Sequence, residues 1–157
     1  MRAGISVVIP SFNGAKKVCQ LLEALCLQSR KPDEVILVID GSTDETQSVA
    51  APYTSRLPLK IVVIPNKGRA GARNAGVDVS EYETLVFFDD DMRPFVNCLQ
   101  DHFEFHHSHP NSILVGHILE DPALFSSDIQ QYRLALYGRM GWTREDKPLA
   151  PLKQDEF

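Results

Sequence analysis

The stretch TLVFFDDD, residues 84–91, places three consecutive carboxylates directly behind an apolar run. The run at residues 84–88 is typical of a strand buried on both faces, as in a parallel sheet. Open α/β sheets bind their ligands beyond the carboxyl ends of such strands. Neighbouring carboxylates repel each other unless a cation or hydrogen-bond donors share them, so a hard divalent cation is the simplest partner. The stretch therefore predicts a buried strand that ends at metal-binding aspartates, with a solvated acidic turn as the alternative.

Upstream of this stretch, three more apolar runs alternate with segments that have helical spacing. The predicted strands are residues 5–9, 35–39 and 61–64, and the predicted helices are residues 15–29, a second helix opened by a capping box of Ser42 and Glu45, and residues 70–77. Downstream, we expect a helix over residues 95–107, a strand over 112–118 and a helix over 126–138. Alternating strands and helices predict an α/β fold with a mostly parallel, doubly wound sheet.

Composition argues against several classes of protein. With 157 residues, 43% of them hydrophobic and 24% charged, the chain fits one globular domain. The net charge of −5 and the lack of a dense basic face argue against a nucleic-acid partner. Apolar runs are far shorter than the roughly 20 residues of a membrane span, and the N-terminus lacks a signal-peptide pattern. The three cysteines lack CxxC spacing, which predicts reduced thiols and a cytoplasmic location, with peripheral attachment at the inner face of the membrane left open.

Three strand ends are expected to meet at one edge of the predicted sheet. They carry the loop at residues 10–13, Asp40 and the aspartate triplet at residues 89–91. Since the carboxyl ends of parallel strands share one edge, these residues can line one cleft. A basic group before the last strand suits a diphosphate held between cations and a metal; it consists of Lys67, Arg69 and Arg73. The pattern favours a nucleotide diphosphate, although Phe12 alone is typical of packing and Asp40 alone of a turn.

Four motifs in this order resemble the family-2 inverting glycosyltransferases, which have the GT-A fold. The motifs are VIPSFN (residues 8–13), VIDGSTD (38–44), GRAGARNAG (68–76) and FFDDD (87–91). The resemblance extends over residues 5 to about 118. It implies a Rossmann-like GT-A sheet in which residues 1–118 bind a nucleotide sugar, while residues 119–157 begin an incomplete acceptor-side region.

The resemblance implies contacts with a nucleoside-diphosphate sugar of the UDP type. Around the base it places Pro10, Ser11 and Phe12, and it counts Asn13 among the residues that bind the nucleotide sugar. It makes Asp40 the acceptor for a uracil-type N3–H. Ile39 stands where the family often has a first aspartate, so the base contact falls on Asp40 alone. Arg73 is placed near the base and the diphosphate, and Arg69, from the basic group, is expected to bind the nucleotide sugar as well.

The aspartate triplet corresponds to the family's Asp-x-Asp motif. The resemblance makes Asp91 the direct metal ligand, places Asp90 near the ribose and gives Asp89 a supporting role at the metal or the donor sugar. Mg²⁺ or Mn²⁺ held by one or two carboxylates and by diphosphate oxygens is the pattern expected for a hard cation. The cation would offset charge on the leaving nucleoside diphosphate. A zinc site at His102 and His106, four residues apart on a predicted helix, is the competing metal hypothesis.

The general base of an inverting transferase has no counterpart in this sequence. Such a base takes the proton from the acceptor hydroxyl, and in the family it follows a segment beyond the Asp-x-Asp motif. Residues 119–157 do not match that segment, and the acidic pair at residues 120–121 follows the fifth predicted strand too soon. We therefore expect the base to lie beyond Phe157, so that the isolated chain is a fragment that binds the donor weakly and transfers no sugar to its unknown acceptor. The alternatives are a non-catalytic nucleotide- or partner-binding module, and a phosphatase with an Asp-x-Asp nucleophile.

Overall fold

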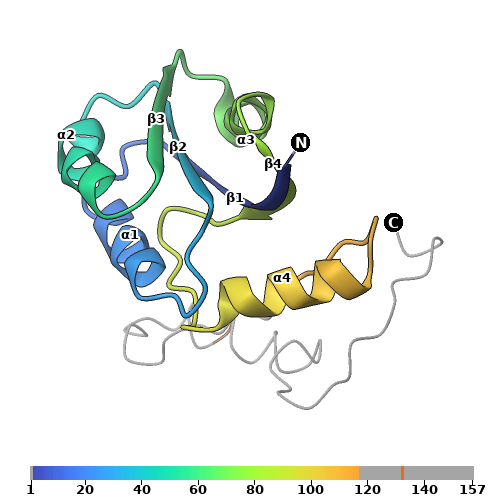
Figure 1. The fold of residues 1–157 in the computed structure, drawn as a ribbon. Coiled ribbons are helices and arrows are strands. Elements are labelled where there is room, and N and C mark those ends of the chain that lie inside the picture. The colour runs from blue at the N-terminus through green and yellow to red at the C-terminus, as the bar shows by residue number, and fades with distance from the viewer. Residues whose placement is uncertain (1, 117–131, 133–157) are drawn as a thin grey trace. The chain divides into compact units, whose positions relative to one another are not determined.

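A computed structural model describes residues 2–116 and 132, and Figure 1 shows their arrangement. Within these residues one sheet contains β1 (Arg2–Ser11), β2 (Glu34–Asp40), β3 (Leu59–Ile64) and β4 (Tyr82–Phe87). The strand order is β3-β2-β1-β4 and every pairing is parallel. The predicted doubly wound parallel sheet is confirmed. The order changes direction between β1 and β4, which is the switch point where open α/β sheets bind ligands.

Helices cover both faces of the sheet because the two central strands, β1 and β2, are apolar and buried on both faces. The strand predicted to be buried at residues 84–88 lies instead at the edge of the sheet as part of β4, where Phe87 leaves 42% of its surface exposed. One face packs against α1 (Val18–Cys26), α2 (Thr46–Ala50), the 3₁₀ helix η1 (Ala51–Ser55) and α4 (Cys98–Ser108). The other face packs against α3 (Gly68–Asp78), which lies across the sheet from α1 in Figure 1. Along β1, Val7 and Ile9 face the first layer and Val8 faces α3. None of the helices described is both long and apolar enough to cross a membrane.

Gly76 allows α3 to approach the sheet closely. A Cβ added at Gly76 would lie 2.4 Å from Val8 Cγ1 and 3.3 Å from Val38 Cγ2. Real Cβ atoms do not approach other heavy atoms to 2.4 Å, so any side chain here would force the helix away from β1 and β2. This contact matters for function because α3 also carries Arg69 and Arg73 toward the carboxyl edge of the sheet.

The start of α2 differs from the predicted capping box. Ser42 Oγ does not cap the helix; it accepts the backbone N–H of Asn13 at 3.0 Å. Glu45 stands at the N-cap position without a side-chain cap, and Asp44 Oδ1 accepts the N–H of Thr46, the first residue of α2, at 3.1 Å. The prediction was wrong because the loop after β1 competes for the hydroxyl of Ser42, and nothing local in the sequence reveals that loop.

Two downstream predictions fall at the edge of the described residues. Residues 112–116 are not a strand, contrary to the strand predicted over 112–118. The helix predicted over 126–138 lies outside the described residues apart from Tyr132. Contacts group the chain through Ser112 into one compact unit, which contains all of the expected site residues. The domain boundary at residue 118 stays a prediction.

A buried carboxylate connects the strands at the edge opposite the expected cleft. Glu34, 2% exposed, accepts the hydroxyl of Ser6 at 2.6 Å and the backbone N–H of Glu81 at 3.0 Å. Its other oxygen, Oε1, lies 2.5 Å from Lys60 Nζ. Burial alone would raise the pKa of Glu34, but the hydrogen bonds from Lys60, Ser6 and the Glu81 amide outweigh burial and lower that pKa below its usual 4.5.

The lowered pKa of Glu34 predicts that acid destabilises the fold. Because the folded state holds this group ionised, its contribution is present above pH 4.5 and is lost as the pH falls through the folded-state pKa. Urea unfolding of wild type, Glu34→Gln and Glu83→Gln from neutral pH down to about pH 3 measures this. The exposed Glu83 serves as the matched control. We expect Glu34→Gln alone to be less stable at neutral pH and less sensitive to acid; equal acid sensitivity in all three proteins would contradict this.

Candidate functional site

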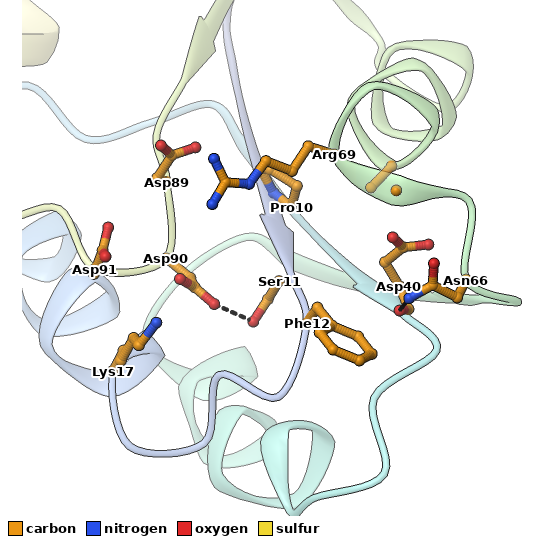
Figure 2. Close-up of a pocket in the computed structure, with 12 residues that line it drawn as sticks. Pro10, Ser11, Phe12, Lys17, Asp40, Asn66, Arg69, Asp89, Asp90 and Asp91 are labelled. Carbon is orange, nitrogen blue, oxygen red and sulfur yellow. Dashed lines mark hydrogen bonds between the residues drawn. The ribbon is translucent and has the colours of Figure 1, made fainter.

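A cavity of about 270 Å³ opens where β1, β2 and β4 end, as Figure 2 shows. It is lined by Pro10, Ser11, Phe12, Lys17, Asp40, Asn66, Gly68, Arg69, Ala72, Asp89, Asp90 and Asp91. The predicted meeting of three strand ends is therefore present in the structure. Of the residues predicted to bind a nucleotide sugar or metal, all line this cavity except Asn13 and Arg73.

One side of the cavity combines an aromatic ring with a buried carboxylate. Phe12 leaves 54% of its surface exposed, which is uncommon for a core phenylalanine and leaves a ring face available for stacking. Asp40, 3% exposed, uses Oδ1 to accept the backbone N–H of Lys67 at 2.6 Å. Its backbone carbonyl accepts the side-chain amide of Asn66 at 3.2 Å. Within the described part of the chain, Oδ2 accepts no hydrogen bond, so Asp40 keeps one acceptor for a ligand.

The three aspartates of the triplet have three different surroundings. Asp89 forms an ion pair with Arg73 through Oδ1. Asp90 accepts the hydroxyl of Ser11 through Oδ2 at 2.6 Å, as the dashed line in Figure 2 marks. Asp91 is exposed and makes no hydrogen bond or ion pair with the other residues that the structure describes. Asp91 is thus the member of the triplet whose carboxylate is fully available to a ligand.

Positive charge stands beside these carboxylates. Arg69 and Lys17 line the cavity from two different elements, and in Figure 2 the amino group of Lys17 points toward Asp90. Arg73 does not line the cavity and instead pairs with Asp89. An anion placed here would meet cations on two sides, which suits a phosphate group.

Asn13 is not among the residues that line the cavity. Its backbone has a φ of +51°, a conformation that asparagine tolerates in tight turns. Its side-chain oxygen accepts the backbone N–H of Thr43 at 2.9 Å, and its own N–H donates to Ser42. The side chain therefore joins the loops after β1 and β2, and its predicted contact with a nucleotide stays a prediction.

Sequence reasoning missed four residues that line the cavity: Lys17, Asn66, Gly68 and Ala72. Asn66 could have been found, because it follows β3 and the rule applied to the other strand ends also holds there. Lys17 sits just before α1, and no sequence pattern distinguishes it from its neighbour Lys16. Gly68 and Ala72 contribute backbone and a methyl group, which carry no chemical signal.

The donor set of the cavity fits a hard cation that a ligand helps to bind. No group of three or more His, Cys, Asp or Glu side chains within the described residues can hold a metal by itself. Carboxylates at the mouth of a cavity that also suits a phosphate are the arrangement in which Mg²⁺ or Mn²⁺ takes its remaining ligands from the phosphate. The residues that would hold the cation are Asp91 and Asp89.

The alternative zinc site gains no support from α4. The rings of His102 and His106 stack with their centroids 6.0 Å apart. Burial lowers the pKa of His102, followed in effect by the neighbouring His106. The described residues provide no third ligand beside this pair.

The chain was compared with known proteins. It matches the family description "Glycosyl transferase family 2" over residues 6–153. It is 34% identical over 121 residues to an uncharacterized glycosyltransferase of Haemophilus influenzae, which covers 73% of this chain and 43% of that protein.

Two solved structures are similar to this one. The crystal structure of Staphylococcus aureus TarS in complex with UDP-GlcNAc has a TM-score of 0.64 and 26% identity, covering 75% of this chain and 38% of that chain. A mannosyltransferase from Pyrobaculum calidifontis in complex with GDP-Man and Mn²⁺ has a TM-score of 0.53 and 28% identity, covering 58% of this chain and 28% of that chain. The chain thus spans less than half of the length of these similar proteins.

Proposed function

This chain belongs to glycosyl transferase family 2, with the α/β architecture of GT-A glycosyltransferases, and on that premise we propose that it is the donor-binding half of an inverting hexosyltransferase. Residues 1–118 would bind a nucleoside-diphosphate sugar, and residues 119–157 would begin the acceptor side. The observation that carries the proposal is that one cavity brings together an exposed aromatic ring, a carboxylate with a free oxygen, two cations and an aspartate that has no partner among the described residues. The residues are Phe12, Asp40, Lys17, Arg69 and Asp91. These are the groups that a base, a diphosphate and a metal require.

We propose a UDP-type donor because of the hydrogen bonding of Asp40. The backbone N–H of Lys67 already donates to Oδ1 of Asp40, so Oδ2 remains to accept one N–H from the base. Uracil presents a single N–H between two carbonyl groups, whereas guanine presents two adjacent N–H donors that need two acceptors. A guanine donor left unpaired in a buried site weakens binding. The similar TarS structure contains UDP-GlcNAc, which is consistent with this choice.

We propose that Mg²⁺ or Mn²⁺ binds at Asp91, with Asp89 in support. When bound, the cation would stabilise negative charge on the departing nucleoside diphosphate. The chain's own contribution is to hold carboxylates beside the phosphate position and to place Arg69 and Lys17 around it. Arg73 keeps Asp89 oriented through their ion pair. The mannosyltransferase that this chain resembles was solved with Mn²⁺.

We place the general base outside this chain, which spans 43% of the length of its Haemophilus influenzae relative. Nothing in the cavity suits an acceptor hydroxyl, since its carboxylates lie where the donor and metal would bind. The isolated chain is therefore expected to bind the donor without transferring sugar. A cytoplasmic location is also proposed, supported by Cys19, Cys26 and Cys98, which are all free thiols.

Calorimetry with nucleoside diphosphates tests this function. With Mn²⁺ present, we expect wild type to bind UDP about tenfold more tightly than GDP or CDP, because a mismatched buried hydrogen bond costs about 1–3 kcal/mol. In Asp40→Asn the side-chain oxygen can still accept the Lys67 N–H, while its NH₂ group faces the base. That NH₂ group can donate to the ring acceptor N3 of cytosine, but it would face the N3–H donor of uracil without a hydrogen bond. The preference should therefore shift from UDP toward CDP.

Three results would count against the proposal. Absence of UDP binding by the wild-type chain would remove the donor-binding role. Equal loss of UDP and CDP binding in Asp40→Asn would show that Asp40 supports the fold rather than reads the base. Sugar transfer by the isolated chain from a UDP-sugar would contradict the placement of the general base outside it.

A further inference from the structure

The hydrogen bond between Ser11 and Asp90 joins the ends of β1 and β4 across the switch point of the sheet. Ser11 Oγ donates to Asp90 Oδ2 at 2.6 Å, and the two residues are 79 positions apart in the sequence. Ser11 is 3% exposed, whereas Asp90 is only partly buried and lines the cavity. The carboxylate of an aspartate turns easily about its Cβ–Cγ bond. A hydrogen-bond donor fixed on a buried strand end therefore selects one orientation of that carboxylate.

Gly14 provides the space that this hydrogen bond occupies. A Cβ added at Gly14 would lie 2.1 Å from Ser11 Oγ and 2.4 Å from Asp90 Oδ2. The loop is held in that place because the N–H of Gly14 donates to Thr46 Oγ1 at 2.9 Å. The local chain path is thus built around the pair, with no room for a side chain that would separate the two oxygens.

The hydroxyl hydrogen of Ser11 points to Asp90 and is therefore not available to donate to a nucleotide. The residue also has little exposed surface. Phe12, the next residue, is the one that presents its side chain at the surface. An effect of Ser11 on binding would therefore pass through Asp90.

We propose that Ser11 is a positioning residue that turns the free oxygen of Asp90 toward the ribose of the bound nucleotide. This inference rests on the proposed function, because it needs a nucleoside diphosphate in the cavity. Removing the hydroxyl would leave Oδ2 without its donor and free the carboxylate to turn toward Lys17, which points at Asp90 in Figure 2. The result would be loss of recognition of the ribose hydroxyls rather than loss of the fold.

The test compares UDP with its 2′-deoxy and 3′-deoxy forms by calorimetry in the presence of Mn²⁺. Wild type is expected to bind UDP about tenfold more tightly than at least one deoxy form. In the deoxy form the ribose hydroxyl that donates to Asp90 is missing, and a carboxylate left without that donor weakens binding. Ser11→Ala and Asp90→Asn should each weaken UDP binding by about 10–100-fold and bring that ratio close to one. In the double variant, Ser11→Ala should add nothing further, because its whole effect acts through Asp90.

Ser6→Ala is the matched control. Ser6 lies on the same strand, is fully buried and donates to a carboxylate, Glu34, at the same 2.6 Å, but at the opposite edge of the sheet. It should lower the urea midpoint and leave the ratio of UDP to deoxy-UDP affinity unchanged. This control separates loss of a buried hydroxyl from loss of the orientation of Asp90.

The outcomes distinguish this inference from the proposed function. No binding of UDP by wild type would overturn both. UDP binding with no discrimination against either deoxy form, or a Ser11→Ala variant that keeps the wild-type ratio, would overturn the role of Ser11 alone. Additive losses in the double variant would also overturn it, because they would mean that Ser11 acts on the ligand independently of Asp90.

Discussion

Replacing Asp91 by alanine is expected to abolish the Mn²⁺-dependent part of UDP binding, a loss of more than about 100-fold. Within the described residues Asp91 is the triplet member without a hydrogen bond or ion pair, so its carboxylate has no competing partner to leave when a cation binds. Asp91 is exposed and has no hydrogen bond or ion pair among the described residues, so its replacement removes no contact that holds the fold. The urea midpoint should therefore stay close to that of wild type.

Calorimetry with and without Mn²⁺ measures the effect, with Asp78→Ala as the control. Asp78 is an equally exposed aspartate at the end of α3 and does not line the cavity. We expect Asp78→Ala to keep the full gain in UDP affinity on addition of Mn²⁺. If Asp91→Ala keeps this gain as well, the cation binds elsewhere and the assignment of the triplet is wrong.

Replacing Gly76 by valine is expected to lower the free energy of unfolding by about 3 kcal/mol. The Cβ alone would lie 2.4 Å from Cγ1 of Val8. Val8 lies on β1 and is completely buried against α3. Helix propensity works slightly in the opposite direction, because glycine is less favourable than valine inside a helix by roughly a few tenths of a kcal/mol. A loss of stability would therefore show that packing against β1 outweighs propensity at this position.

Urea unfolding of Gly76→Val and Ala70→Val tests this packing argument. Ala70 lies on the exposed side of the same helix, so its valine variant introduces the same branched side chain without meeting the sheet. We expect Ala70→Val to stay within about 0.5 kcal/mol of wild type. Equal stability of the two variants would mean that α3 can move away from β1 at little cost, and that Arg69 and Arg73 are held less firmly than the structure indicates.

The sheet could be predicted because its signals are local. The apolar runs at residues 5–9, 35–39, 61–64 and 84–88 each correspond to a strand, and the structure extends the first one to Arg2–Ser11. Predictions failed where a second partner decided the outcome. Ser42 does not cap α2 as predicted; its Oγ instead accepts the backbone N–H of Asn13 in the loop after β1. Residues 112–116, which contain three consecutive apolar residues, are not a strand.

The site could be predicted as a set of residues but not as a set of contacts. Strand ends in a parallel sheet share one edge, so Phe12, Asp40 and the triplet were expected to meet, and they do. Lys17 was missed because its place at the cavity follows from the path of the loop after β1. The hydrogen bond from the Thr43 N–H to the Asn13 side chain could not be read from the sequence either, and the predicted contact of Asn13 with the ligand stays a prediction.

By itself the sequence determined the fold class, the family and the edge of the sheet where the ligand should bind, because strand positions and strand ends follow from patterns a few residues long. Only the tertiary structure decided which partner each aspartate of the triplet contacts. Asp89 is paired with Arg73, Asp90 is held by Ser11, and Asp91 is left available. These partners stand 16 and 79 residues from the carboxylates they contact, and such distances in sequence leave no local pattern to read. Three identical neighbouring residues thus differ because folding brings a different donor to two of them and, among the described residues, none to the third.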